Sequence, residues 1–331
     1  MSWHRTAMTT RPGIAVTHGD SVVGARLVTE LGALGAVTGV AADELVAGDL
    51  KRALEPIETV VHLASATTGP LEGTRRVLDA AGDAACAHLV VVTSALVYGA
   101  WPTNPVPLTE DAGLRPNPGF EPAVLLAEVE RLVAEWHDAH PAAVVTILRP
   151  APVVAEGEAG WLAPMLAAVR GVPVGDDDPP GQFVHLDDLA SAVVRVVTDR
   201  LPGVFNVAPE GWIDGDALRA LQGGPRLRLP GRVAERVASW RFRAGMSPTP
   251  PGLLPWTTAP WVVAADRLRA TGWTAAHSNE EAFVAGHRAS PWATVSPRRR
   301  QEIALGASAG VAALAVTAVT VAVRRRLRRP R

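Results

Sequence analysis

The chain of 331 residues is short of three reactive side chains, with one cysteine, one tyrosine and one lysine, namely Cys86, Tyr98 and Lys51. A single cysteine excludes a disulfide framework and a cysteine-based zinc site. Cys86 lies in an alanine-rich helical stretch, so we expect a buried structural thiol. The net charge of −1 gives no excess of positive charge that would attract nucleic acid, so we predict no nucleic-acid partner.

One long run near the C-terminus is uncharged and rich in alanine and valine. Residues 303–323 carry no charge, and arginines lie on both sides of them. A helix of that length spans about 30 Å, the thickness of the hydrocarbon core of a bilayer. The alternative is a buried soluble helix, which rarely stays free of charge for so long. We predict a transmembrane helix at 303–323, preceded by a basic linker at 297–302 and followed by an Arg-rich tail at 324–331.

The N-terminal residues 1–12 have no apolar core of their own and are expected to be a flexible segment, not a signal peptide. We therefore expect a cytoplasmic folded part and a location in the cell membrane through a single C-terminal span. The six arginines of the tail conflict with the positive-inside rule, because the tail would have to cross. Gly306 and Gly310 have the spacing of a helix-pairing motif, which leaves a homodimer open, although alanine- and glycine-rich segments often match it by chance.

Apolar β-branched runs alternate with helical stretches between residues 13 and 150. The expected strands are 14–17, 36–40, 59–63, 88–93 and 144–148, and the expected helices are 22–34, 71–87 and 124–139. Apolar strands separated by helices predict a doubly wound, Rossmann-type parallel α/β sheet that carries its ligands at the carboxyl ends of the strands. Residues 151–296 are richer in proline and glycine, and they predict a smaller, irregular α+β part.

The first expected strand leads into the sequence VTHGDSVVG. It resembles the phosphate loop T-G-x-x-G-x-x-G of the extended short-chain dehydrogenases/reductases, the NAD-dependent epimerase/dehydratase family. Thr17 and Gly24 match, whereas His18 and Ser21 replace the glycines that allow the tight turn and the approach of the pyrophosphate. Gly19 could serve the turn one position later. The resemblance implies NAD or NADP as cofactor, and the two replacements leave its binding open.

Two more segments resemble cofactor contacts of that family. Asp49 and Leu50 resemble its adenine-contacting pair, although they could also be a loop residue and a core residue. The sequence VVHLAS resembles the strand end beside the nicotinamide ribose and implies a contact from Ala64. Asp43 comes too late after the second strand to be assigned to the adenosine ribose.

The catalytic positions of the family are only partly filled. The sequence LVVVTSALVYG resembles its fifth strand, with Ser94 at the catalytic serine or threonine and Tyr98 at a structural tyrosine. The flanking motifs place the catalytic tyrosine at Pro122 and the catalytic lysine at Leu126. In the family the tyrosine hydroxyl acts as general acid/base and the lysine lowers its pKa. Proline and leucine can do neither, so the resemblance implies a degenerate catalytic site.

Other titratable groups could act as a substitute base. Glu121 and Glu128 lie near the replaced positions, but we favour solvated helix residues, with Glu130 on the same polar side. His62 and His185 lie in apolar strand contexts, where a hydrogen-bonded core histidine is commoner than a catalytic one.

The sequence QFVHLDD resembles a later strand-to-helix junction of the family. We expect Asp187 or Asp188 to cap the helix that follows. No nearby histidine or cysteine pattern supports a metal role for these aspartates, so no metal site is predicted.

Two functions remain. The first is a membrane-anchored member of the family with a degenerate catalytic site, which binds a nucleotide, a nucleotide-sugar, a lipid-linked metabolite or a protein partner. The second is an atypical NAD(P)-dependent oxidoreductase or sugar-nucleotide epimerase that uses Ser94 with an unrecognised base. Pro122 and Leu126 favour the first function.

Overall fold

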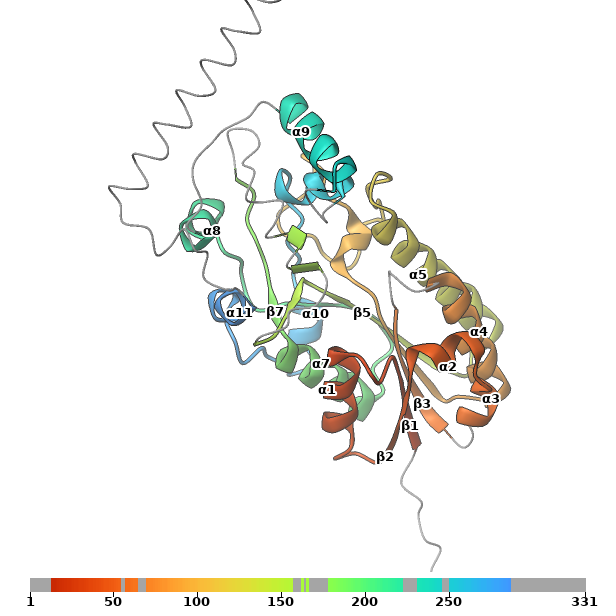
Figure 1. Ribbon diagram of the computed structural model, residues 1–331. Helices are drawn as coiled ribbons and strands as arrows, with labels where there is room; N and C mark the ends of the chain where they lie inside the picture. The colour runs from red at the N-terminus through yellow and green to blue at the C-terminus, as the bar shows by residue number, and fades with distance from the viewer. Residues whose placement is uncertain are drawn as a thin grey trace, which may run out of the picture.

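The structure is a computed structural model that describes residues 13–54, 57–64, 70–156, 162–163, 165–166, 178–222, 231–245 and 250–286. Its centre is a six-stranded parallel sheet with the order β2-β1-β3-β4-β5-β8 (Figure 1). The strands are β1 (Gly13–Thr17), β2 (Ala36–Val40), β3 (Ile57–Leu63), β4 (His88–Val92), β5 (Val144–Pro150) and β8 (Gly203–Val207). The predicted doubly wound parallel sheet is confirmed.

Helices cover both faces of this sheet. On one face α1 packs beside α7, and on the other α4 packs beside α5, with the short helices α2 and α3 against α4 (Figure 1). Their bounds are α1 (Val22–Leu31), α2 (Ala42–Ala47), α3 (Leu50–Ala53), α4 (Pro70–Asp83), α5 (Glu121–Ala139) and α7 (Leu186–Asp199). Every residue of β4 is buried, as expected for a parallel strand between two helical layers.

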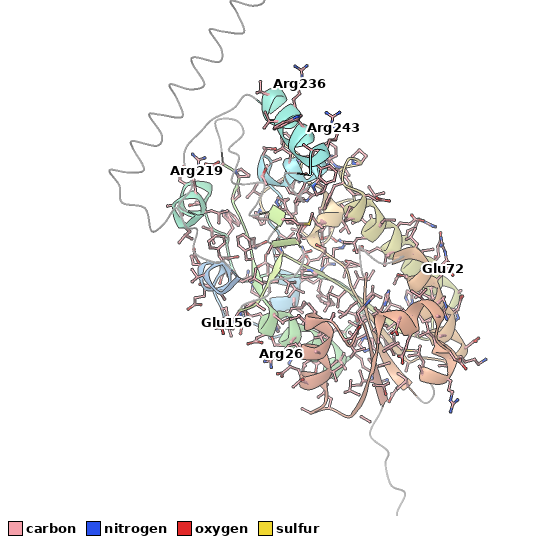
Figure 2. All side chains as sticks on the ribbon, viewed as in Figure 1. Arg26, Glu72, Glu156, Arg219, Arg236 and Arg243 are labelled. Atoms are coloured by element: carbon pink, nitrogen blue, oxygen red, sulfur yellow. The ribbon has the colours of Figure 1, made fainter. Side chains whose placement is uncertain are left out.

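The apolar sides of the helices face inward and their charged sides face outward. Leu27 of α1 and Leu148 of β5 belong to one buried cluster, and Leu89 of β4 belongs to a second. Charged side chains such as Arg26 on α1 and Glu72 on α4 lie on opposite sides of the sheet (Figure 2). The two helical layers therefore sandwich the strands and leave only the strand ends open for a site.

The turn before β4 shows why one predicted helix is shorter than expected. The helix expected at 71–87 ends at Asp83, because Ala85 takes a left-handed conformation with φ of 50°. Cys86 follows in the turn with its thiol against the carbonyl oxygens of Glu58 and His88. Cys86 is buried, as we expected, and burial raises the pKa of its thiol.

The central sheet continues beyond the predicted division at Pro150. Its sixth strand, β8, pairs with β5 although it comes from the part expected to be separate. The remaining elements are η1 (Ala95–Tyr98), β6 (Val153–Val154), β7 (Val184–His185), α8 (Gly215–Gln222), α9 (Gly231–Arg243), η2 (Pro251–Thr257), α10 (Asp266–Arg269) and α11 (Asn279–Gly286). Phe183, Ile213 and Phe283 contribute to a third, smaller cluster among these elements.

The predicted transmembrane segment 303–323 lies outside the described residues, as do residues 1–12, 297–302 and 324–331. Within the part that the structure describes, none of the helices combines the length and apolar character of a membrane span. The membrane anchor therefore remains a prediction from the sequence.

Candidate functional site

The order of the strands defines where a ligand would bind. The chain leaves β1 for α1 on one face of the sheet, and it leaves β3 for α4 on the other face. The carboxyl ends of β1 and β3, at Thr17 and Leu63, therefore border the topological switch point. In open parallel sheets this crevice is the usual ligand site.

The loop from β1 to α1 keeps the compact shape of a phosphate loop. His18 takes a left-handed conformation with φ of 52°, a role usually given to glycine. A Cβ on Gly19 would lie 2.7 Å from Gly39 Cα, and one on Gly24 would lie 1.9 Å from the His18 carbonyl oxygen. Glycine is therefore required at both positions, and the packing role predicted for Gly24 has a clear steric cause.

Ser21 occupies the N-terminus of α1 with its own hydroxyl. Ser21 Oγ accepts a hydrogen bond from the Gly24 amide at 3.0 Å and donates one to the His18 carbonyl oxygen at 2.7 Å. Helix N-termini attract anions because their first amides have no partner within the helix. A diphosphate at this helix would compete with Ser21 Oγ for the Gly24 amide, and such a cap is worth about 0.5–2 kcal/mol.

Asp20 is a feature of this loop that the motif comparison missed. Its Oδ1 atom accepts a hydrogen bond from the Ala42 amide at 3.2 Å, so it links the loop to the residues just after β2. Asp43 instead accepts from the Glu44 amide. The exposed carboxylate of Asp20 adds a negative charge where the resemblance places phosphates, and like charges oppose binding.

Thr17 and His62 hold β1 to β3 in the interior. Thr17 Oγ1 accepts a hydrogen bond from the Leu63 amide at 2.9 Å and lies 3.0 Å from His62 Nδ1. His62 Nε2 lies 3.0 Å from Thr74 Oγ1 on α4. Burial, with a contribution from His18, lowers the pKa of His62 to about 3. His62 is therefore the hydrogen-bonded core histidine that we favoured. The Thr17 hydroxyl links β1 to β3 through its bonds to Leu63 and His62.

The other predicted cofactor contacts lie at two separate places, the start of α3 and the end of β3. Asp49 caps α3 by accepting a hydrogen bond from the Arg52 amide at 3.2 Å, and Leu50 is buried in the core. The pair thus begins a short helix. Ala64 follows β3 directly and donates its amide to the Val92 carbonyl oxygen at 3.0 Å. Their roles toward a cofactor remain predictions.

Ser94 lies just after β4 and is nearly buried, with 9% of its surface exposed. Its Oγ accepts a hydrogen bond from the Leu96 amide at 3.3 Å and so caps η1. A hydroxyl that accepts one bond can still donate one. Ser94 therefore keeps the capacity to bind a substrate oxygen.

The two positions implied for the catalytic pair lie on α5 and carry no proton-transfer group. Pro122 is in the first turn, where proline is tolerated because that amide needs no partner in the helix. Leu126, one turn later, is 2% exposed and belongs to the main core. Where the family has a tyrosine and a lysine, this chain has a proline that suits the first turn of α5 and a leucine that packs in the core.

Tyr98 is the structural tyrosine that the resemblance implied. Its hydroxyl donates to Asn206 Oδ1 at 2.8 Å and accepts from Arg149 Nη1 at 2.7 Å. Burial raises the pKa of Tyr98, against the opposing effect of the Arg149 charge. A catalytic tyrosine needs its pKa lowered, so this side chain is unsuited to proton transfer near neutral pH.

Glu130 corrects our expectation of a solvated helix face. It is buried and forms an ion pair with Arg149 at 2.6 Å, and it also accepts a hydrogen bond from Thr93 Oγ1 at 2.7 Å. The pattern misled us because a buried arginine from β5 supplies the partner that makes this burial tolerable. Glu128, by contrast, is partly exposed and pairs with Arg131. It is therefore the solvated helix residue that we favoured.

Lys51 is exposed and forms an ion pair with Asp83 at 3.3 Å, and no contact in the described residues joins it to Ser94. Glu121 begins α5 and is exposed. Thus neither the single tyrosine nor the single lysine replaces the missing pair.

The cap of α7 also differs from our prediction. The N-cap is His185, whose Nδ1 accepts the Asp187 amide at 3.2 Å, and the two aspartates lie inside the first turn. Asp188 instead accepts hydrogen bonds from the Ala276 and His277 amides at 2.6 and 3.1 Å. His277 is distant in sequence, and no sequence pattern could have joined it to this junction.

These observations define an α/β protein of the doubly wound, Rossmann-type class. A family model described as the NAD dependent epimerase/dehydratase family matches residues 14–208. The chain belongs to this family.

Several solved structures have a similar fold. A UDP-glucuronic acid 4-epimerase from Bacillus cereus, in complex with UDP-glucuronic acid and NAD, has a TM-score of 0.63 at 15% identity and covers 83% of this chain and 97% of its own. A UDP-glucose 4-epimerase from Thermus thermophilus with NAD has a TM-score of 0.60 at 18% identity, with the same coverage. MoeE5 with UDP-glucuronic acid and NAD has a TM-score of 0.61 at 20% identity and covers 82% and 97%.

Curated relatives are more similar in sequence over a shorter span. Uncharacterized proteins of Mycobacterium bovis and Mycobacterium tuberculosis are 29% identical over 170 residues, which is 47% of this chain. The aligned region spans 45% of the length of these relatives.

Proposed function

We propose that this chain binds a nucleotide-sugar at the carboxyl ends of β1, β3 and β4 without the standard catalysis of short-chain dehydrogenases. One observation carries the proposal: the positions implied for the acid/base pair hold Pro122 and the buried Leu126. Tyr98 and Lys51 are both engaged elsewhere, in a core network and in a surface ion pair. A site without a general acid/base loses on the order of 10²–10⁴-fold in rate for each proton transfer.

The ligand class is supported by the fold and by the neighbours of similar structure. Those neighbours were solved with UDP-glucuronic acid and with NAD. In this chain the Ser21 cap and the Asp20 carboxylate oppose the diphosphate of a dinucleotide at the first helix. We therefore expect NAD or NADP to bind more weakly than a nucleotide-sugar, which draws its contacts from other strand ends as well.

Titration of the purified full-length protein tests this proposal. Intrinsic fluorescence or calorimetry would measure binding of UDP-glucose, UDP-glucuronic acid, NAD(H) and NADP(H). We expect saturable binding of a UDP-sugar, and a Ser21→Ala variant should bind NAD(H) no less tightly because it removes the competing hydroxyl. Failure of every nucleotide to bind at millimolar concentration would refute the proposal.

A second function is an atypical NAD(P)-dependent oxidoreductase or sugar-nucleotide epimerase. The observation that favours it is the free donor capacity of Ser94 at the end of β4. Turnover of a UDP-sugar that disappears in Ser94→Ala, with unchanged binding, would establish this function in place of the first.

We further propose a membrane anchor for the protein, supported by the uncharged run at 303–323 and its flanking arginines. The anchor would keep the folded part at the cytoplasmic side of the cell membrane. Alkaline carbonate washing of membranes should leave the full-length chain bound and release a variant that ends at residue 302. A full-length chain that is soluble without detergent would contradict the anchor.

A further inference from the structure

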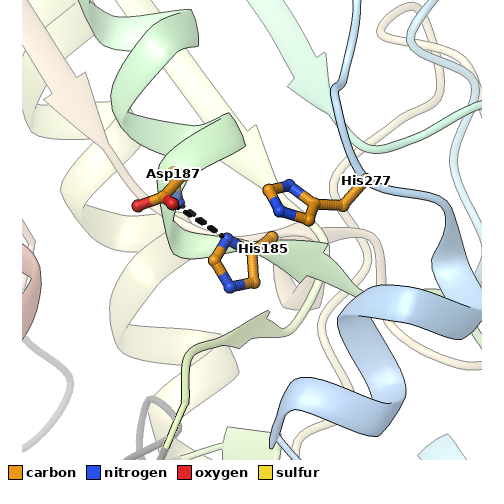
Figure 3. Close-up of side chains that lie close together, drawn as sticks. All are labelled: His185, Asp187 and His277. Carbon is orange, nitrogen blue, oxygen red and sulfur yellow. Dashed lines mark hydrogen bonds and ion pairs between the residues drawn. The ribbon is translucent and has the colours of Figure 1, made fainter.

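Three side chains with the chemistry of metal ligands converge where β7 leads into α7 (Figure 3). His185 and Asp187 come from the strand-to-helix junction, and His277 comes from the segment before α11. One ligand atom from each lies within 4.8 Å of the others. Two imidazoles and a carboxylate are a donor set that binds divalent transition metals.

The Asp187 carboxylate is held so that one oxygen is available. Arg26 on α1 forms an ion pair with Oδ1 at 2.9 Å. The other oxygen, Oδ2, lies 3.6 Å from His185 Nδ1, toward the histidines. Oδ2 is thus directed toward the histidines, which suits a carboxylate that gives one oxygen to a metal.

The His277 ring is oriented by a buried carboxylate. Its Nδ1 lies 3.0 Å from Asp188 Oδ2, and Asp188 is 2% exposed. A neutral histidine in this contact carries its proton on Nδ1, which leaves the lone pair of Nε2 free. Histidine ligands of metals characteristically donate their other nitrogen to a carboxylate in this way. The capping of α7 explains the orientation of the His185 ring, but it does not explain why Asp188 orients the His277 ring.

His185 offers its lone pair in the same region. Its Nδ1 accepts the Asp187 amide at 3.2 Å, so that nitrogen is unprotonated in the contact. A metal on Nδ1 would replace this hydrogen bond and leave an amide in the first turn of α7. The rings of His185 and His277 lie 4.0 Å apart between centroids, so both can turn toward one point.

A pocket of about 780 Å³ opens beside the three side chains. Glu156, Glu280 and Glu281 also line it, so its charge favours a cation. The open space leaves room for a water or a ligand oxygen as a further metal ligand. Sites with three protein ligands and one open position differ in this respect from closed structural zinc sites.

We propose that His185, Asp187 and His277 form a binding site for one divalent transition metal, of which Zn²⁺ is the probe, with an open position toward the pocket. Zinc holds nitrogen and oxygen ligands at about 2.0–2.2 Å, which brings them to roughly 3.3 Å from one another. Closing from the present spacing takes about 1 Å of side-chain movement. The Asp187 side chain is 46% exposed and that of His277 34% exposed, so both have the freedom to make it.

Calorimetric titration of the full-length, EDTA-stripped protein with zinc chloride in a non-chelating buffer tests the site. We expect one Zn²⁺ per chain with micromolar or tighter affinity. His277→Gln and Asp187→Asn should each weaken binding by at least about 10-fold. Thermal unfolding of each variant without metal would show that it still folds.

Two matched variants separate the site from surface histidines and from the ion pair. His137→Gln changes an exposed histidine on α5 and should leave zinc affinity unchanged. Arg26→Gln removes the competing cation but keeps all three ligands, and it should bind zinc as tightly as the unaltered protein or more tightly. Absence of binding below about 100 μM, or equal affinity in His277→Gln and Asp187→Asn to that of the unaltered protein, would overturn the proposal.

Discussion

Tyr98→Phe tests whether the single tyrosine is structural. The change removes one hydroxyl, which leaves buried Asn206 Oδ1 without its donor and Arg149 Nη1 with only its long contact to the Glu110 carbonyl oxygen at 3.4 Å. Each unsatisfied buried group costs about 1–3 kcal/mol, so we expect a loss of about 2–4 kcal/mol in the free energy of unfolding. At about 2–3 °C per kcal/mol for a large domain, the midpoint should fall by roughly 5–10 °C.

Thermal and urea unfolding followed by circular dichroism would measure this loss. Glu130→Gln should cost more, about 3–5 kcal/mol, because it leaves Arg149 as an uncompensated buried charge. Lys51→Ala is the matched control at the other unique residue, since it removes only an exposed ion pair and should shift the midpoint by about 1 °C or less. A Tyr98→Phe variant with unchanged stability and altered ligand turnover would refute the structural role.

The remaining predictions concern a glycine and a histidine of the candidate site. Gly24→Ala should destabilise the protein strongly and abolish nucleotide binding, because a Cβ there would lie 1.9 Å from the His18 carbonyl oxygen. Gly73→Ala on α4 is the control: a Cβ there would meet no other part of the fold within 4 Å, so this variant should be more stable by about 0.5–1 kcal/mol in parallel urea titrations. His62 has a folded pKa of about 3, below its unfolded value near 6.5, so its contribution to stability is complete above pH 6.5 and is lost as the pH falls toward 3. Between pH 7 and pH 5 this loss should be about 2 kcal/mol, and His62→Gln should remove that part of the pH dependence; an unchanged profile in the variant would exclude His62 as its source.

The fold could be predicted because its signals are local. Strands such as β4 are continuous apolar runs, and the chain alternates them with helices of the right length. The predicted bounds of β2 were confirmed, and those of β1 differ by one residue. The role of Tyr98 was also within reach, since the turn after β4 carries a specific local motif.

What the sequence could not show depends on contacts between distant residues. Glu130 has the helical spacing of its exposed neighbours, and only Arg149 from another strand makes its burial tolerable. His185 and His277 are joined through the fold, and so is the Asp188 carboxylate that orients His277. Asp20 contacts the Ala42 amide just after β2, and the motif gave no reason to expect an acidic group at this place in the loop.

The central claim is that the chain binds a nucleotide-sugar but lacks standard catalysis, and a single-turnover assay tests it most directly. Excess full-length protein, supplied with NAD, would be incubated with UDP-glucose, and the sugar would be analysed by mass spectrometry and NMR alongside a binding measurement on the same sample. With Pro122 and Leu126 in place of the acid/base pair, we predict bound but unchanged UDP-glucose. Conversion to the C4 epimer or to an oxidised product, lost in Ser94→Ala, would contradict the account.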